Sequence, residues 1–340
     1  MTQRFVVVLA CMVLLALSAA AFAAVPATQP KRPLPTASQI AKLLAAMPEH
    51  IRSIRLSYTY SYRMATAHHA PGLKPSEVSL DWDMLNNCVR AKLVGPSRDA
   101  HAPKIPFVTE WVRNLKSEWY AMPETGRTWT VQLTRTGNWD QIPDFTYRAN
   151  FGLTYLHQAM VPFVARRLPV PVAGHAAGTP MITLLHVVSI THAGRHAFKV
   201  VYRSPRTFPG GSGRVVLKLR LDRGLQILRT QIFATPKGPP GILAYDIRQE
   251  HFTSDGHGHF FPELIRGKTW QPSSRKIRER FVIRIHRVRV NPQFSAKTFI
   301  YVPTYGSFVF DDRHTPGHNY RYGYKNPKAT LGHDSGHPTK

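Results

Sequence analysis

Hydrophobic and polar residues alternate along several stretches of this chain, and this two-residue period constrains the fold more than any other feature. Leu56, Tyr58, Tyr60, Tyr62 and Met64 fall on one face of an extended segment, while the residues between them are Arg, Ser or Thr. Successive side chains of a β-strand point to opposite sides, so the pattern predicts a strand with one buried face.

The same alternation recurs in both halves of the chain. Asp222-Arg223-Gly224 separates the last alternating segment from an apolar run over residues 225–233, which is typical of an antiparallel hairpin. The segments are Val78, Leu80, Trp82 and Met84; Trp129, Val131 and Leu133; and Val215, Leu217, Leu219 and Leu221.

Near His286 the apolar phase shifts by one residue. Phe281, Ile283 and Ile285 are in one phase, and Val288 and Val290 are in the other. An extra residue in one strand produces such a shift, so we expect a β-bulge in a long, bent strand.

Two segments have helical spacing instead. Thr36 or Ser38 can cap a helix whose apolar positions are Ile40, Leu43, Leu44 and Met47. Residues 151–168 carry Leu153, Leu156, Met160 and Phe163 at helical spacing, but Pro162 predicts a break into one or two short helices.

No strand–helix alternation indicates a parallel sheet, so the predicted class is α+β, mainly antiparallel β. Two β-rich halves separated by a helical insertion make either two small domains or one large curved sheet with a helical cover.

The N-terminus resembles an export signal. Arg4 precedes an apolar run over residues 5–17, and Ala21-Phe22-Ala23 matches the small-x-small pattern of signal peptidase sites. We expect cleavage near Ala23 and a periplasmic or otherwise exported protein; an uncleaved membrane anchor is the alternative. Cleavage would remove Cys11 and leave Cys88 as the single cysteine, so no internal disulfide is expected.

Composition divides the rest of the chain. We expect a signal peptide over residues 1–23, a Pro-rich linker over 24–36, a single folded domain over 37–310, and a disordered polar tail over 311–340. The tail contains no Ile, Val, Met, Phe or Trp and therefore has little apolar surface to bury.

The charge is strongly basic, with 45 Lys and Arg against 19 Asp and Glu. A cationic outer face would attract an anionic membrane surface, anionic glycans or nucleic acid. A solvated face without a specific ligand explains the same pattern, and export argues against nucleic acid. The basic run comprises Arg275, Lys276, Arg278, Arg280, Arg284, Arg287 and Arg289.

Catalytic constellations are incomplete. Gly210-Gly211-Ser212-Gly213-Arg214 lacks the last glycine of a nucleophile elbow. His257 and His259, with Asp255 nearby, would need a further ligand to hold zinc. We therefore expect neither an enzyme nor a cofactor or metal, with a zinc hydrolase as the least favoured alternative.

Several short motifs resemble one family when taken in order. They are the segment Ile54 to Tyr60 after a helix; Val215 to Leu221, the Asp222-Arg223-Gly224 turn and Leu225 to Phe233; Gly256 to Pro262; and Val290 to Phe294 with Val302 to Ser307. In outline, residues 37–310 resemble a divergent branch of the periplasmic lipoprotein-localisation carriers of the LolA/LolB type. The resemblance implies an incomplete, curved antiparallel β-barrel wrapped over helices, with an apolar interior for acyl chains.

On this interpretation the chain is an exported lipid- or lipoprotein-binding carrier with a helical lid. The alternative is a cationic cell-envelope module that binds polyanions or has a structural role. An ordinary hydrophobic core explains the same apolar residues without a ligand. The predicted cavity residues are Tyr58, Tyr60, Tyr62, Leu80, Trp82, Trp129, Leu217 and Leu219, and the predicted lid residues are Leu153, Leu156, Met160 and Phe163.

Overall fold

The computed structural model describes residues 33–64, 75–86, 88–96, 107–123, 129–135, 152–160, 163–165, 176, 178–203, 213–222, 224–234, 241–256, 260–271, 276–313 and 318–323. The predicted signal peptide, Cys11 and most of the predicted linker lie outside these residues. One compact unit spans Leu34–Lys340, and the following description concerns that unit. Within the described residues, no helix combines the length and hydropathy needed to cross a membrane.

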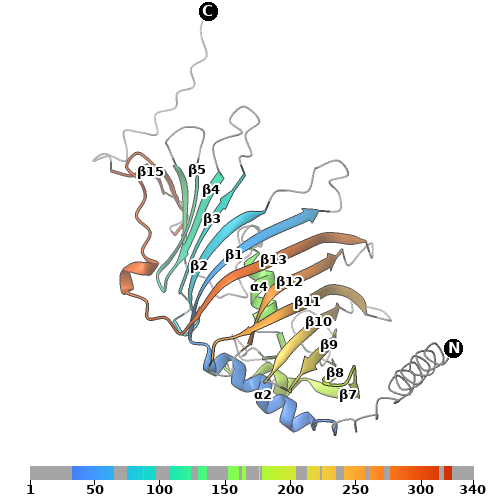
Figure 1. The fold of residues 1–340 in the computed structure, drawn as a ribbon. Coiled ribbons are helices and arrows are strands. Elements are labelled where there is room, and N and C mark those ends of the chain that lie inside the picture. The colour runs from blue at the N-terminus through green and yellow to red at the C-terminus, as the bar shows by residue number, and fades with distance from the viewer. Residues whose placement is uncertain are drawn as a thin grey trace, which may run out of the picture. The chain divides into compact units, whose positions relative to one another are not determined.

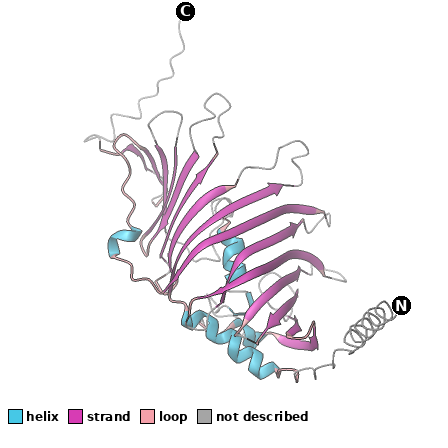
Figure 2. Ribbon diagram, viewed as in Figure 1, coloured by secondary structure: helices cyan, strands magenta, loops and turns pink. Residues whose placement is uncertain are grey.

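In the described part of the chain, fifteen strands form one sheet in the order β15-β14-β6-β5-β4-β3-β2-β1-β13-β12-β11-β10-β9-β8-β7. The sheet is curved and not closed, and helices lie against one of its faces (Figure 1; Figure 2). The predicted incomplete barrel is therefore confirmed, and the two β-rich halves belong to one sheet.

The strands of the first half are β1 (Ser53–Met64), β2 (Ser76–Asp83), β3 (Cys88–Gly95), β4 (Phe107–Arg113), β5 (Ser117–Pro123) and β6 (Trp129–Arg135). Those of the second half are β7 (His186–His192), β8 (Ala197–Arg203), β9 (Gly213–Arg220), β10 (Gln226–Ala234), β11 (Ile242–Ser254), β12 (Phe260–Trp270) and β13 (Ile277–Val290). Each pairs antiparallel with its neighbours in these sets, and β1 joins the halves by pairing with β13.

The bulge near His286 is confirmed. Ser57 pairs with Arg287 and Tyr58 pairs with Ile285, so His286 is the extra residue of β13. The bulge therefore lets the apolar side chains of β13 face the inner side of the sheet both before and after His286, although their phase in the sequence changes there.

Helix α2 (Ala37–His50) begins with the capping box that the sequence indicated. The Thr36 hydroxyl accepts from the Gln39 backbone N–H at 3.2 Å, and Gln39 Oε1 accepts from the Thr36 N–H at 2.8 Å. Ile40 and Leu44 are buried in the main core. Thr36, rather than Ser38, is thus the cap, and α2 packs into the main core through one apolar face.

The mid-chain insertion is broken as predicted. Helix α4 (Leu153–Met160) is followed by the 3-10 turns η1 (Phe163–Ala165) and η2 (Met181–Leu184). Pro162 lies in the interval between α4 and η1, where a proline has no N–H to continue a helix.

The expectation of disorder from residue 311 onward is wrong for part of that tail. Strand β14 (Phe308–Asp311) pairs in parallel with β6, and β15 (His318–Arg321) pairs antiparallel with β14. Val309 packs with Ala121, Val131 and Leu133 in a second small core. The tail is poor in apolar residues, but it gains backbone partners and a preformed apolar surface from the sheet. The remaining tail residues lie outside the description.

Candidate functional site

The inner face of the curved sheet gathers most of the predicted cavity residues. Tyr62 is partly buried and packs against their cluster, whereas the side chain of Trp129 lies outside the description. The structure also places the predicted lid residues Leu153, Leu156 and Met160 in this cluster; the side chain of Phe163 is not described. Tyr58, Tyr60, Leu80, Trp82, Leu217 and Leu219 are at most 4% exposed and belong to the same core.

Helix α4 covers this apolar face. Leu153, Leu156 and Met160 are 2%, 0% and 4% exposed, so their side chains point into the core. The helix has 8 residues, and isolated helices below about 12–15 residues are marginal in water. Its position therefore depends on its contacts with the sheet.

A buried carboxylate on β13 forms the main polar contact with α4. The Tyr60 hydroxyl donates to Glu279 Oε1 at 3.2 Å, and the Tyr155 hydroxyl donates to Glu279 Oε2 at 2.6 Å. Glu279 is 8% exposed. We call Tyr60, Tyr155 and Glu279 the latch, because they join strand β1, helix α4 and strand β13.

Burial and the nearby carboxylate keep both tyrosines protonated. Burial raises the pKa of Tyr60 and Tyr155 far above the usual value, and the charge of Glu279 raises both further. The Arg278 charge acts in the opposite direction on the pKa of Tyr155. Each hydroxyl therefore remains a donor to the carboxylate, and a charged acceptor makes such hydrogen bonds comparatively strong.

An aromatic stack also holds Tyr155 of the latch in place. The rings of Tyr155 and Phe281 stack at 3.8 Å between centroids, with planes 11° apart. Phe281 pairs with Gly267 of β12, where an added Cβ would lie 2.1 Å from the Phe281 ring. Gly267 is thus the residue that leaves room for the ring on which α4 rests.

Further contacts hold both ends of α4. Gln249 of β11 donates from Nε2 to the backbone oxygen of Ala159 at 2.9 Å. The ring of His157 meets Trp82 edge-on at 5.0 Å. At the start of the helix, Gly152 has φ +68° and lies against the Tyr60 ring. Most of these contacts are made by side chains, so local changes in rotamer can break them.

The sequence interpretation missed Tyr155, Glu279, Phe281, Gly267 and Gln249 as members of the site. One signal was present in the sequence. Glu279 shares the alternation phase of Phe281, Ile283 and Ile285, so the pattern places an acidic side chain on the apolar face of the strand. A buried carboxylate requires partners. Its partners are far away in the chain, with Tyr60 lying 219 positions from Glu279.

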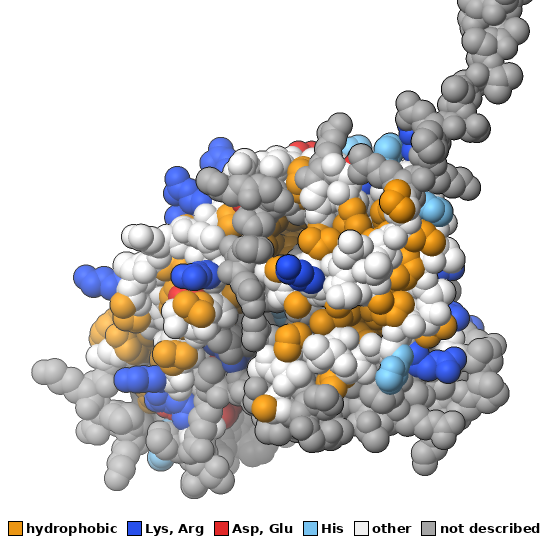
Figure 3. Space-filling model, turned by 90° about the horizontal axis from the view of Figure 1, so that it is seen from below, with side chains coloured by type: hydrophobic (Ala, Val, Ile, Leu, Met, Phe, Trp, Pro, Cys, Tyr) orange, Lys and Arg blue, Asp and Glu red, His pale blue; other side chains and the backbone are white. Residues whose placement is uncertain are grey.

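The side of the molecule where α2 lies also carries apolar surface. Figure 3 views this side, where hydrophobic side chains gather in the middle and most basic side chains lie toward the margin. Leu34 and Leu43, before and on α2, are 44% and 42% exposed.

A small hollow of about 160 Å³ lies where β12 and β13 part. The pairing of these strands begins only at Leu264 and Arg284, and Phe261, Ile285 and Val288 line the gap beside Asp255 and His286. Within the described residues no group of three His, Cys, Asp or Glu could hold a metal ion. His257 and His259 lie outside them, so the zinc alternative is not tested.

Comparisons with known proteins give a distant likeness at the level of structure. No model of a known protein family matches the chain, and no curated protein matches it. A solved structure described as a putative outer membrane lipoprotein-sorting protein domain from Vibrio parahaemolyticus is similar over 78% of this chain and 97% of that one, with 9% identity and a TM-score of 0.42. This degree of similarity is too low to assign a family or a function.

Proposed function

We propose that this chain is an exported binding protein that holds acyl chains of a lipid or lipoprotein on the inner face of its half-barrel, beneath α4, without covalent chemistry. One observation carries the proposal: a helix too short to be stable alone covers an apolar sheet face and is held there by a polar latch. Displacing α4 would uncover apolar surface that an acyl chain could cover in its place.

The magnitudes are compatible with such an exchange. Opening breaks the two tyrosine–carboxylate hydrogen bonds, each of which contributes about 1.5–3 kcal/mol when one partner is charged. Burying an acyl chain of about 16 carbons contributes on the order of 10 kcal/mol before entropy costs, at ~0.8 kcal/mol per CH₂. A long acyl chain therefore offsets the two hydrogen bonds and can also replace apolar contacts that Leu153, Leu156 and Met160 lose on opening, whereas a short one does not.

The direct test is to identify what the protein carries. We expect native mass spectrometry of the purified protein, or organic extraction followed by lipid analysis, to detect a phospholipid or acylated peptide bound in near-equimolar amount. Protein that retains its fold but binds neither endogenous lipid nor added palmitate would contradict the proposal.

A sharper test weakens the latch. Tyr155→Phe removes the donor to Glu279 Oε2 and keeps the ring on Phe281. If the binding-competent state has α4 displaced, destabilising the closed state raises the population of that state. We expect Tyr155→Phe to lower the free energy of unfolding and yet bind a fluorescent fatty acid about tenfold more tightly.

Tyr202→Phe is the matched control. Tyr202 is 1% exposed on β8, and its hydroxyl has no hydrogen-bond partner within the described residues. Removing that hydroxyl should leave fatty-acid affinity unchanged. Equal affinities for wild type and Tyr155→Phe, together with lower stability of the variant, would mean that the latch is only part of the core.

A further inference from the structure

The outer face of the sheet carries a cluster of basic side chains across four neighbouring strands. On β12 and β13, Arg266, Lys268, Arg280 and Arg284 alternate with buried inner residues such as Ile265 and Ile283. Lys268 is partly buried and the others are exposed. We call the following residues the outer basic belt: Arg248 of β11, Arg266 and Lys268 of β12, Arg280, Arg284, Arg287 and Arg289 of β13, and Arg63 of β1.

Several belt residues lie directly opposite one another in the sheet. Arg248 pairs with Arg266, and Arg280 pairs with Lys268 on one side and with Arg63 on the other. Like charges at directly opposite positions destabilise a sheet. The belt therefore costs folding stability, which a bound anion would recover.

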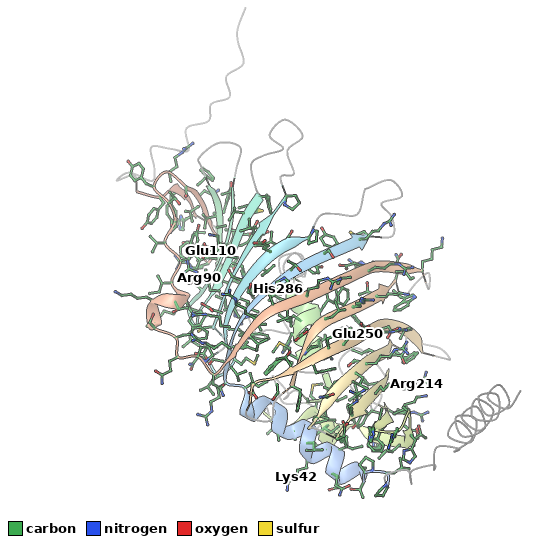
Figure 4. All side chains as sticks on the ribbon, in the orientation of Figure 1. Lys42, Arg90, Glu110, Arg214, Glu250 and His286 are labelled. Atoms are coloured by element: carbon green, nitrogen blue, oxygen red, sulfur yellow. The ribbon has the colours of Figure 1, made fainter. Side chains whose placement is uncertain are left out.

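The side chains of the belt residues form no ion pair or hydrogen bond within the described part of the chain, unlike those of other arginines of the same sheet. Arg229 donates twice to Asp246, at 2.6 and 2.7 Å, and Arg55 donates to Asp81 at 2.5 and 3.0 Å. Arg90 binds Glu110, and both are labelled in Figure 4. Glu250 lies in the same region of the sheet (Figure 4), and within the described residues its side chain forms no ion pair or hydrogen bond with the belt. The belt thus has a large excess of positive charge.

We propose that the outer basic belt docks the protein on an anionic phospholipid bilayer. Four adjacent strands cover about 15 Å across the sheet, and residues 280–289 cover about 30 Å along β13. Charge spread in two dimensions matches the anionic headgroups of a membrane leaflet, whereas a single small anion would occupy only one corner. Docking does not depend on acyl binding, because the belt and the latch lie on opposite faces of the sheet.

The test compares two triple variants of the full chain that lose the same charge. Arg266→Gln/Lys268→Gln/Arg280→Gln removes the centre of the belt. Lys42→Gln/Lys116→Gln/Lys297→Gln removes three exposed lysines elsewhere, of which Lys42 projects from α2 (Figure 4). Binding is measured by co-sedimentation with two kinds of vesicle. One kind contains about 30% phosphatidylglycerol in phosphatidylcholine, and the other contains phosphatidylcholine alone.

We expect wild type to bind the anionic vesicles and to dissociate as salt increases. The belt variant should bind about 100-fold more weakly, and the lysine variant less than about threefold more weakly. The neutral vesicles report any contribution of the apolar segment at residues 5–17. Equal losses in both variants, or binding to dextran sulfate but not to vesicles, would overturn the proposal. Fatty-acid affinity measured without vesicles tests the carrier proposal separately.

Discussion

At the scale of single residues, the latch depends on three side chains that the sequence places far apart. The sequence predicted that Tyr60 would be buried, and it is 2% exposed. It did not predict that a carboxylate would share that environment, because the contact depends on the pairing of β1 with β13. The alternation fixes which side of a strand a residue faces, but it does not indicate which side chain lies opposite.

The raised pKa values of the latch tyrosines predict how stability depends on pH. In the unfolded chain a tyrosine loses its proton near pH 10, whereas in the folded protein Tyr60 and Tyr155 keep theirs to higher pH. Their contribution is therefore complete below about pH 10 and is lost as pH rises above it, at about 1.4 kcal/mol per pH unit for each tyrosine. Urea unfolding between pH 9 and 11 should show a shallower decline in Tyr155→Phe than in wild type. Parallel declines would contradict this assignment.

At the scale of elements, the sequence predicted the helices and the strands β1, β2, β6, β9, β10 and β13, because each has a local period. Thr36, Pro162 and His286 marked a cap, a break and a bulge, and all three are confirmed. The parallel pairing of β14 with β6 had no such signal. That pairing depends on residues 291–307 crossing from the end of β13, a path that no local pattern encodes.

The pair formed by Gly267 and Phe281 gives a prediction for strand β12. Gly267→Ala would place a Cβ 2.1 Å from the Phe281 ring, and overpacking of this kind costs about 1–3 kcal/mol. The ring must then move and disturb its stack with Tyr155. We expect Gly267→Ala/Phe281→Leu to be less destabilised than the sum of the two single variants, by denaturant unfolding. Additive losses would show that the ring and the glycine are not coupled.

Strand β11 contains one residue with a strained backbone, His251. Glu250 pairs with Leu264 and Phe252 pairs with Pro262 in an unbroken register, so His251 lies opposite Glu263, and it has φ 55°. Left-handed backbone costs an ordinary residue about 1–2 kcal/mol, but glycine adopts it readily. We expect His251→Gly to raise the free energy of unfolding by about 1 kcal/mol, measured in urea. The matched variant Glu250→Gly, at a paired position, should lower it.

At the scale of the whole molecule, the formal net charge of +26 opposes compaction. Screening by salt weakens repulsion among exposed charges, with a Debye length of about 10 Å at 0.1 M. We expect the melting temperature to rise as NaCl increases from about 20 to about 300 mM, which is roughly a tenfold increase in ionic strength. The rise should be smaller in Arg266→Gln/Lys268→Gln/Arg280→Gln, which should also be the more stable protein at low salt. A melting temperature independent of salt would contradict this account of the charge.

The position of β1 in the sheet has a consequence for how the chain matures. The first strand lies between β2 and β13, so its second neighbour is contributed by a segment that begins at Ile277. Pairings of such long separation form slowly. Nearly all of the polypeptide must leave the ribosome before the centre of the sheet can close. Until then the centre of the sheet stays open, and the export proposed for this chain would have to take place in that state.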